Sequence, residues 1–149
     1  MKKLIKNYTT DIPAERTIAE IQNLLAKNGA RGFALEYDES GRIKDIFFKI
    51  RLNDKELPFR LPAKPDNVYA ALFAGMQYED RLRQERMKKA EAIAWRICKT
   101  WLEAQITLIN LEQAKIEEVF LPYLIMLGNK TLFETMEQNQ FLLSESHQT

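Results

Sequence analysis

Basic side chains are concentrated in one stretch of the chain, RLRQERMKK. This stretch carries five cations, opposed within it only by a glutamate: Arg81, Arg83, Arg86, Lys88 and Lys89. On a helix, such side chains can follow the phosphate backbone of a nucleic acid. Acidic residues also flank the stretch, at Glu79, Asp80 and Glu91. A solvated helix face with balanced charge is therefore the alternative interpretation.

A second group of cations lies in a segment where apolar and polar residues alternate. Lys49, Arg51 and Arg60 fall at positions that share one face of adjacent strands, with Glu36 as part of the counter-charge. An arginine fork fits a phosphate group, and Phe47 or a tryptophan could stack on a base. This group predicts a phosphate-bearing ligand.

The run EAIAWRICKTWLEAQITLI combines two tryptophans with polar side chains on one predicted helix. Glu91 and Gln105 project within its apolar arc, where an unpartnered polar group is costly. Each of them either meets a hydrogen-bond partner or lines a partly buried pocket. In the second case Trp95 or Trp101 offers a stacking surface, with Arg96 at the rim. The predicted ligand-binding set is Arg60, Trp95, Arg96, Gln105, Lys49 and Arg51.

Catalytic chemistry finds little support in the sequence. The one histidine, His147, lies in the polar tail, which argues against Ser-His or Cys-His pairs and a histidine-bearing metal site. Cys98 lies on an apolar stripe, where a structural thiol is expected. The glycines are isolated, so no phosphate loop is present. Paired acidic residues are typical of solvated surface: Glu36 and Asp38, Glu79 and Asp80, Glu117 and Glu118. We expect no catalytic residue, no metal and no cofactor.

Composition indicates a soluble globular protein of 149 residues, with 46% hydrophobic and 29% charged residues. Lys+Arg 22 against Asp+Glu 21 leaves a net charge of +1, so no field of the whole molecule recruits nucleic acid or a membrane. The single cysteine and the absence of a secretion signal or a long apolar run predict a cytoplasmic protein. We expect one domain, residues 1–149, with mobile ends at 1–8 and 144–149.

Periodicity predicts an α+β fold. An N-terminal helix in TTDIPAERTIAEIQNLLAKNG precedes alternating segments in GFALEYDE, RIKDIFFKIRLN and ELPFRLP, which predict a three-stranded antiparallel meander. Pro58 and Pro62 cannot donate to a strand ladder, which puts the third strand at an edge. A helical half follows, dominated by one long helix from Glu79 to Leu111.

The long helix carries two apolar stripes, which together predict packing on two sides and a homo-oligomer. A heptad-like seam contains Ile97, Trp101 and Leu108, and the second stripe contains Trp95 and Leu102. We expect Trp101 in the core and Trp95 nearer a pocket or a subunit interface. The predicted core residues are Phe33, Leu35, Phe48, Ile50, Phe59, Ile97 and Trp101.

At LPFRLPAKPDNVYAAL, AIAWRICKTWLEAQ and EEVFLPYLI, the chain resembles a widespread family of small proteins encoded by tailed phages and prophages. The resemblance covers most of the chain, from the first helix to the segment after Pro122. It implies an accessory protein acting inside a bacterial cell, in phage DNA metabolism or against host defence. It brings no catalytic residues with it.

Three functions follow as hypotheses, none of them enzymatic. The first is an oligomer that sequesters a phosphate-bearing nucleotide, a role that fits an anti-defence protein. The second is a nucleic-acid-binding accessory of phage replication or recombination that uses the basic stretch. The third is a protein–protein inhibitor of a host enzyme, with an exposed apolar surface around VFLPYLIML. The alternative for that last run is packing on the long helix or across a subunit interface.

Overall fold

The computed structural model describes residues 4, 9–75 and 79–142. His147 and, apart from Leu4, the predicted mobile ends lie outside these residues. The chain forms two compact units, each built from two stretches of sequence. The first unit comprises residues 1–29 and 62–113, and the second comprises residues 30–61 and 114–149.

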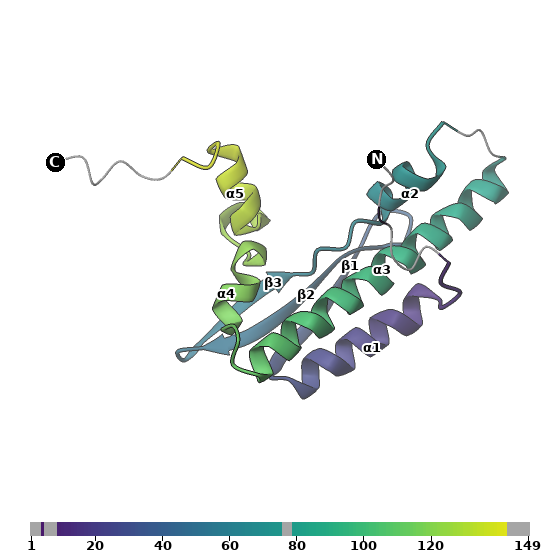
Figure 1. Cartoon of the computed structure of the whole chain (residues 1–149). Coiled ribbons are helices and arrows are strands. Elements are labelled where there is room, and N and C mark those ends of the chain that lie inside the picture. Colours follow the sequence, from purple (N-terminus) through teal and green to yellow (C-terminus); the bar gives the residue numbers. More distant parts are fainter. Residues whose placement is uncertain (1–3, 5–8, 76–78, 143–149) are drawn as a thin grey trace. The chain divides into compact units, whose positions relative to one another are not determined.

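The order of elements confirms the predicted α+β fold, with a helix, a three-stranded antiparallel sheet and a helical half that contains one long helix (Figure 1). No helix in the described part of the chain is long and apolar enough to cross a membrane. The elements are α1 (Ala14–Lys27), β1 (Ala30–Tyr37), β2 (Ile43–Leu52), β3 (Lys55–Arg60), α2 (Pro65–Phe73), α3 (Asp80–Asn110), α4 (Ile116–Phe120), η1 (Leu121–Tyr123), η2 (Leu127–Asn129) and α5 (Leu132–Gln138).

In the first unit, α1 and α2 both pack on α3. The inward stripe of α1 contains Thr17, Ile18, Ile21 and Leu25, which are all buried. Steps of three and four residues put these side chains on one face of the helix. The apolar pattern that predicts α1 therefore also selects the face that it buries.

The rotation of α3 differs from the prediction. Trp95 is 1% exposed, whereas Ile97 and Trp101 are only half-buried, so the predicted order of burial for the two tryptophans is wrong. The buried stripe is the one with Trp95, Cys98, Leu102 and Ile106. Arg96 and Lys99 of α3 both reach Glu20 of α1, which turns their side of α3 toward α1. At about 100° of rotation per residue, Trp95 and Ile106 both lie next to Lys99, within about 40° of it around the helix.

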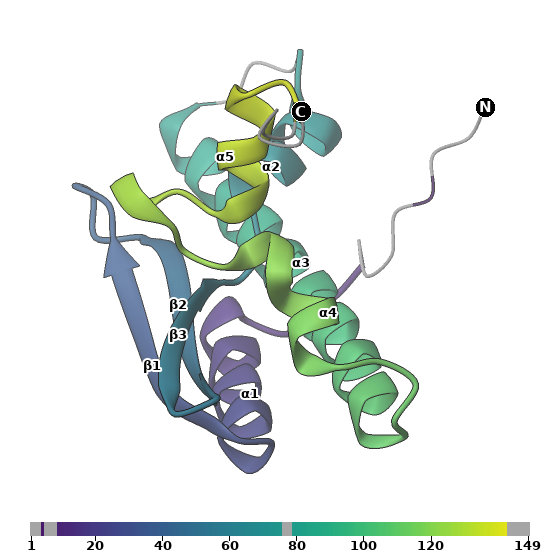
Figure 2. The same ribbon diagram turned by 90° about the vertical axis from the view of Figure 1, so that its left-hand side faces the viewer.

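In the second unit, β1, β2 and β3 form an antiparallel sheet in that order (Figure 2). A two-residue turn joins β2 to β3, and its residues Asn53 and Asp54 both have positive φ, as a type I′ hairpin requires. The edge position predicted for β3 from its prolines is confirmed.

One face of the sheet is apolar, as the alternation predicts. Phe48, Ile50 and Phe59 are buried, which confirms their assignment to the core. Phe33 and Leu35 are half-buried, so the prediction that they lie in the core is wrong. Both belong to β1, which has a strand neighbour on one side only among the described residues.

The C-terminal segment wraps around the outer edge of β3. On the apolar face, the ring of Phe120 lies 5.3 Å from that of Phe48 and 6.0 Å from that of Phe59. At the edge, Leu124 forms a β-bridge with Phe59, and the Ile125 N–H donates to the Pro58 carbonyl at 2.9 Å. The backbone of Pro58 therefore faces away from β2, so its missing N–H costs the β2–β3 ladder nothing.

Candidate functional site

Arg60 occupies the polar face of the sheet, where it holds the C-terminal segment. Its Nη1 donates to Glu134 Oε1 at 2.8 Å and its Nη2 donates to the Asn129 carbonyl. Its Nε lies 3.8 Å from Asp45 Oδ1, and its guanidinium lies 5.8 Å from the centre of the Phe47 ring. The side chain is 17% exposed. Arg60 thus joins two strands to the segment before and within α5.

Glu134 is fixed by the start of its own helix as well as by Arg60. It accepts the Thr131 N–H at 2.8 Å, while Thr131 Oγ1 accepts the Glu134 N–H, which completes a capping box. The Thr131 N–H, together with the hydrogen bond and charge of Arg60, lowers the pKa of Glu134. This carboxylate is therefore held in its charged form.

Lys49 and Arg51 share the polar face with Arg60, because their register partners in β3 are Pro58 and Glu56. Both side chains are exposed. Arg51 lies 3.5 Å from Asp54, a surface contact that adds little stability. The stem of Lys49 lies over Gly32 of β1, where a Cβ atom would meet Lys49 Cδ at 3.5 Å. The three predicted cations thus share one face of the sheet, but of the three only Arg60 is mostly buried.

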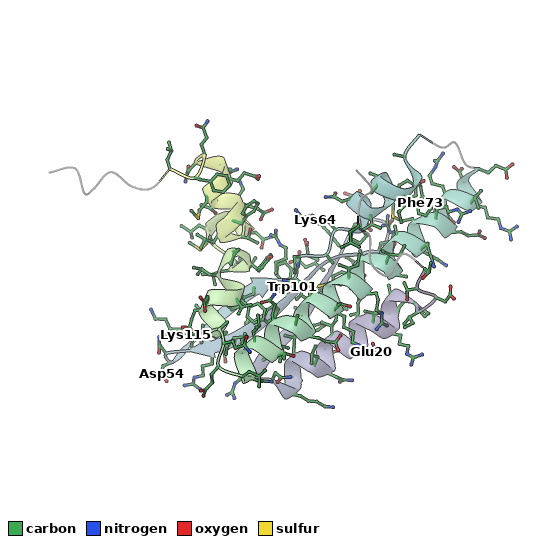
Figure 3. All side chains as sticks on the ribbon, in the orientation of Figure 1. Glu20, Asp54, Lys64, Phe73, Trp101 and Lys115 are labelled. Carbon is green, nitrogen blue, oxygen red and sulfur yellow. The ribbon has the colours of Figure 1, made fainter. Side chains whose placement is uncertain are left out.

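Arg96 belongs to the first unit and joins α3 to α1. It donates to Glu20 at 3.1 Å and to the buried Thr17 hydroxyl at 2.7 Å, and it is 13% exposed. Glu20 lies on α1 and is labelled in Figure 3. Lys99 reaches it at 2.9 Å, and Arg16 reaches it at 3.4 Å. The hydrogen bond from Lys99, followed by the contribution of Arg96, lowers the pKa of Glu20.

The other members of the predicted ligand-binding set lie on α3. The buried ring of Trp95 can stack on a ligand only if its surroundings move. Gln105 and Glu91 are half-buried. The first unit therefore holds Trp95, Arg96 and Gln105, and the second unit holds Arg60 with the other two sheet-face cations.

The basic stretch begins α3 and does not form a single stripe. Arg81 and Lys88 share one side of the helix, while Arg83 and Arg86 lie on nearly the opposite side, at about 100° per residue. Neighbours already contact several of these cations. Arg81 lies 3.7 Å from Glu85, Arg83 lies 3.3 Å from Asp80, Arg86 lies 5.5 Å from the centre of the Phe73 ring, and Lys89 contacts Asp11 and the Thr10 carbonyl.

Exposed apolar side chains are concentrated in the C-terminal segment. The apolar run predicted there is split, since Phe120 is buried, Tyr123, Leu124 and Ile125 are half-buried, and Leu127 is 96% exposed. We call the exposed set the C-terminal apolar group: Leu121, Met126, Leu127, Phe133, Phe141 and Leu142.

Sequence reasoning missed Phe133, Phe141 and Leu142. The rings of Phe133 and Phe141 lie 5.8 Å apart. A turn after α5 brings them together, with Gln140 and Phe141 at positive φ and the Phe141 N–H donating to the Met136 carbonyl at 2.7 Å. Neither residue is a glycine, so the sequence carries no signal for this turn.

The remaining chemistry of the described residues is sparse. Burial raises the pKa of the Cys98 thiol to about 12, so it remains protonated and unreactive at neutral pH. No cluster of three His, Cys, Asp or Glu side chains suited to a metal ion occurs among residues 4, 9–75 and 79–142. No family model, no curated protein and no solved structure matches the chain.

Proposed function

We propose that this chain is a non-enzymatic, self-associating protein that binds another protein through its C-terminal apolar group. The observation that carries the proposal is the exposure of six large apolar side chains between Leu121 and Leu142. Single exposed apolar residues are ordinary, whereas their concentration in one segment is typical of an interaction site. This proposal corresponds to the third of the hypotheses drawn from the sequence.

The turn after α5 supports a role for Phe141 beyond packing. Positive φ at a residue with a Cβ costs on the order of 1–2 kcal/mol, and Gln140 and Phe141 both adopt it. The result is an aromatic side chain that is half-exposed next to Phe133. Backbone strain that presents an apolar side chain to solvent points to a functional site.

Charge indicates the kind of partner. The described residues from Ala114 onward contain two lysines, Lys115 and Lys130, and four glutamates: Glu117, Glu118, Glu134 and Glu137. Only Glu134 is engaged with an arginine in the geometry described above. The complementary partner surface is apolar with a basic rim.

Capture from a bacterial lysate tests the proposal. The variant Leu127→Glu with Phe141→Ser removes two exposed apolar side chains, and we expect it to retain the fold but lose at least tenfold in captured partner. Leu111→Glu is the matched control, because Leu111 is also exposed but lies in the first unit. Equal capture by the double variant and the wild type would contradict the proposal.

A nucleotide ligand is the second candidate, favoured by the cations of the sheet face beside Phe47. In a phage-encoded anti-defence protein of the bacterial cytoplasm, this face would sequester the ligand without cleaving it. Calorimetry against a panel of cyclic and linear nucleotides tests this candidate, with Lys49→Ala and Arg51→Ala expected to weaken binding. Heat of binding that is absent for every nucleotide would remove it.

The nucleic-acid hypothesis has the exposed cations Arg81, Arg83, Arg86 and Lys88 in its support. Fluorescence anisotropy with single- and double-stranded oligonucleotides at two salt concentrations tests it. Affinity should fall steeply with salt if these side chains contact phosphates. No binding at low salt would rule out this function.

A further inference from the structure

The two outer edges of the sheet differ in their backbone pairing. At the β3 edge, Leu124 and Ile125 bond to the strand. Within the described residues, the outer edge of β1 pairs with no strand. β1 also contains neither proline nor lysine, two residues with which proteins commonly protect a free edge.

The hydrogen-bond pattern shows which groups β1 offers at this edge. The Leu61 N–H donates to the Ile46 carbonyl, so even-numbered residues of β2 direct their backbone toward β3. Odd-numbered residues of β2 therefore face β1, where their partners are Gly32, Ala34 and Glu36. The backbone groups of Phe33 and Leu35 consequently point outward.

We propose that β1 of one chain pairs antiparallel with β1 of a second copy, across a two-fold axis at Ala34. This inference deepens the self-association in the proposed function and uses a surface separate from the C-terminal apolar group. The pairing joins two three-stranded sheets into one continuous sheet, with the β1 edge of each copy covered by that of the other.

The register follows from the outward-facing residues. With the axis at Ala34, Phe33 of each copy pairs with Leu35 of the other, so both outward residues of each copy form hydrogen-bonded pairs. With the axis at Phe33 or at Leu35, only the residue on the axis would form a hydrogen-bonded pair, with the same residue of the second copy. The β1–β2 register shifts at Arg31 and again before Tyr37, and these shifts limit the regular edge at both ends.

Side chains agree with this register on both faces. Phe33 meets Leu35 of the second copy on the apolar face, where both are half-buried in the single chain. On the polar face, Ala34 meets its own copy, and Gly32 lies opposite Glu36 of the second copy. Lys49, whose stem crosses Gly32, is thereby directed toward that glutamate. The two-fold axis repeats this contact, so that Lys49 of each copy faces Glu36 of the other copy.

Disulfide trapping tests the register. Cys98 is buried and its thiol is protonated, so it should not compete with an introduced cysteine. Across the axis, the Ala34 Cα atoms of the two copies would lie about 4.5 Å apart, within disulfide range. Oxidised Ala34→Cys should therefore run as a covalent dimer. Glu36→Cys is the matched control, because the two introduced cysteines would lie about 13 Å apart and should not form a covalent dimer.

A mixture of Gly32→Cys and Glu36→Cys chains should form the mixed dimer, because these positions face each other in the proposed register. A Cβ at residue 32 meets only ordinary contacts, so the Gly32→Cys chain should fold. Glu36→Cys cross-linking as fast as Ala34→Cys, or no dimer from Ala34→Cys, would overturn the proposal.

Light scattering on Ala34→Lys provides a second test. Ala34 is exposed in the single chain, so the variant should fold, but two lysines would meet at the axis. We expect wild type at twice the mass of one chain and Ala34→Lys at one chain mass, with unchanged circular dichroism. A monomeric wild type at micromolar concentration, or a dimeric Ala34→Lys, would contradict the pairing. Ala34→Lys retains the C-terminal apolar group, so partner capture can succeed or fail independently.

Discussion

Arg60 in the second unit and Arg96 in the first make similar contacts with different consequences. Each donates to a glutamate more than seventy positions away, Glu134 and Glu20 respectively, and each is mostly buried. Around Arg96, two helices also share a buried apolar stripe. Around Arg60, the segment that is held keeps several apolar side chains exposed. The first arginine therefore aligns helices that are already packed, and the second fixes a segment whose apolar side chains face solvent.

The largest effect is expected from the apolar stripe of the first unit. Trp95→Ala removes a ring that is 1% exposed and should lower the free energy of unfolding by about 3–5 kcal/mol. Trp101→Ala removes a half-buried ring and should cost less. Urea denaturation of both variants measures the difference. A larger loss for Trp101→Ala would mean that the rotation of α3 is not the one described.

Arg60→Ala should have the next largest effect, and the effect should be local. The variant loses hydrogen bonds to Glu134 and to the Asn129 carbonyl, which we expect to cost about 2 kcal/mol. Amide hydrogen exchange should accelerate in residues 121–142. Arg60→Lys keeps the charge but loses the guanidinium fork, so its stability and exchange rates should lie between those of wild type and Arg60→Ala. Unchanged exchange in this segment would show that Phe120 and the β-bridge hold it without Arg60.

Arg96→Ala should cost less, about 1–2 kcal/mol, although its side chain is equally buried. Lys99 remains at 2.9 Å from Glu20, and the apolar stripe of α3 is intact, so mainly the Thr17 hydroxyl loses its partner. Exchange should rise across the first unit as a whole rather than in one segment. A loss larger than that of Arg60→Ala, measured by urea denaturation, would reverse the comparison.

The smallest effect is a pH dependence centred on Glu134. Its pKa is lowered below the ordinary 4.5 in the folded chain, so it stabilises the fold at pH values above 4.5. This stabilisation is lost as the pH falls from there through the folded pKa. Thermal melts between pH 7 and pH 3 should show a shallower decline for Glu134→Gln than for wild type. Identical declines would indicate that the contact between Arg60 and Glu134 does not contribute to acid sensitivity.

Sequence patterns were sufficient where periodicity and local chemistry decide the structure. Alternating residues predict the meander, and the prolines predict the edge position of β3. The predicted bounds of the long helix differ from those of α3 by one residue at each end. The rotation of α3 was not predictable, because its two apolar stripes are equivalent until a neighbour is known. The carboxylate partners of Arg60 and Arg96 were missed for a related reason, since they lie far away in the sequence.

The candidate site was the harder part to predict. Lys49, Arg51 and Arg60 do share a sheet face, as strand alternation requires. The rings of Phe133 and Phe141 come together through a turn with positive φ at Gln140 and Phe141, which has no sequence signature. A site made by an unusual turn is visible only once the backbone is known.

The proposed docking role of the C-terminal apolar group is tested most directly by photo-crosslinking in bacterial cells. p-Benzoylphenylalanine introduced at Phe141 replaces one half-exposed aromatic side chain with another, and the same residue at the exposed Leu111 is the control. We predict that ultraviolet light yields an adduct with a different protein from position 141 and none from position 111. No adduct at position 141, or the same adducts at both positions, would contradict the proposed function.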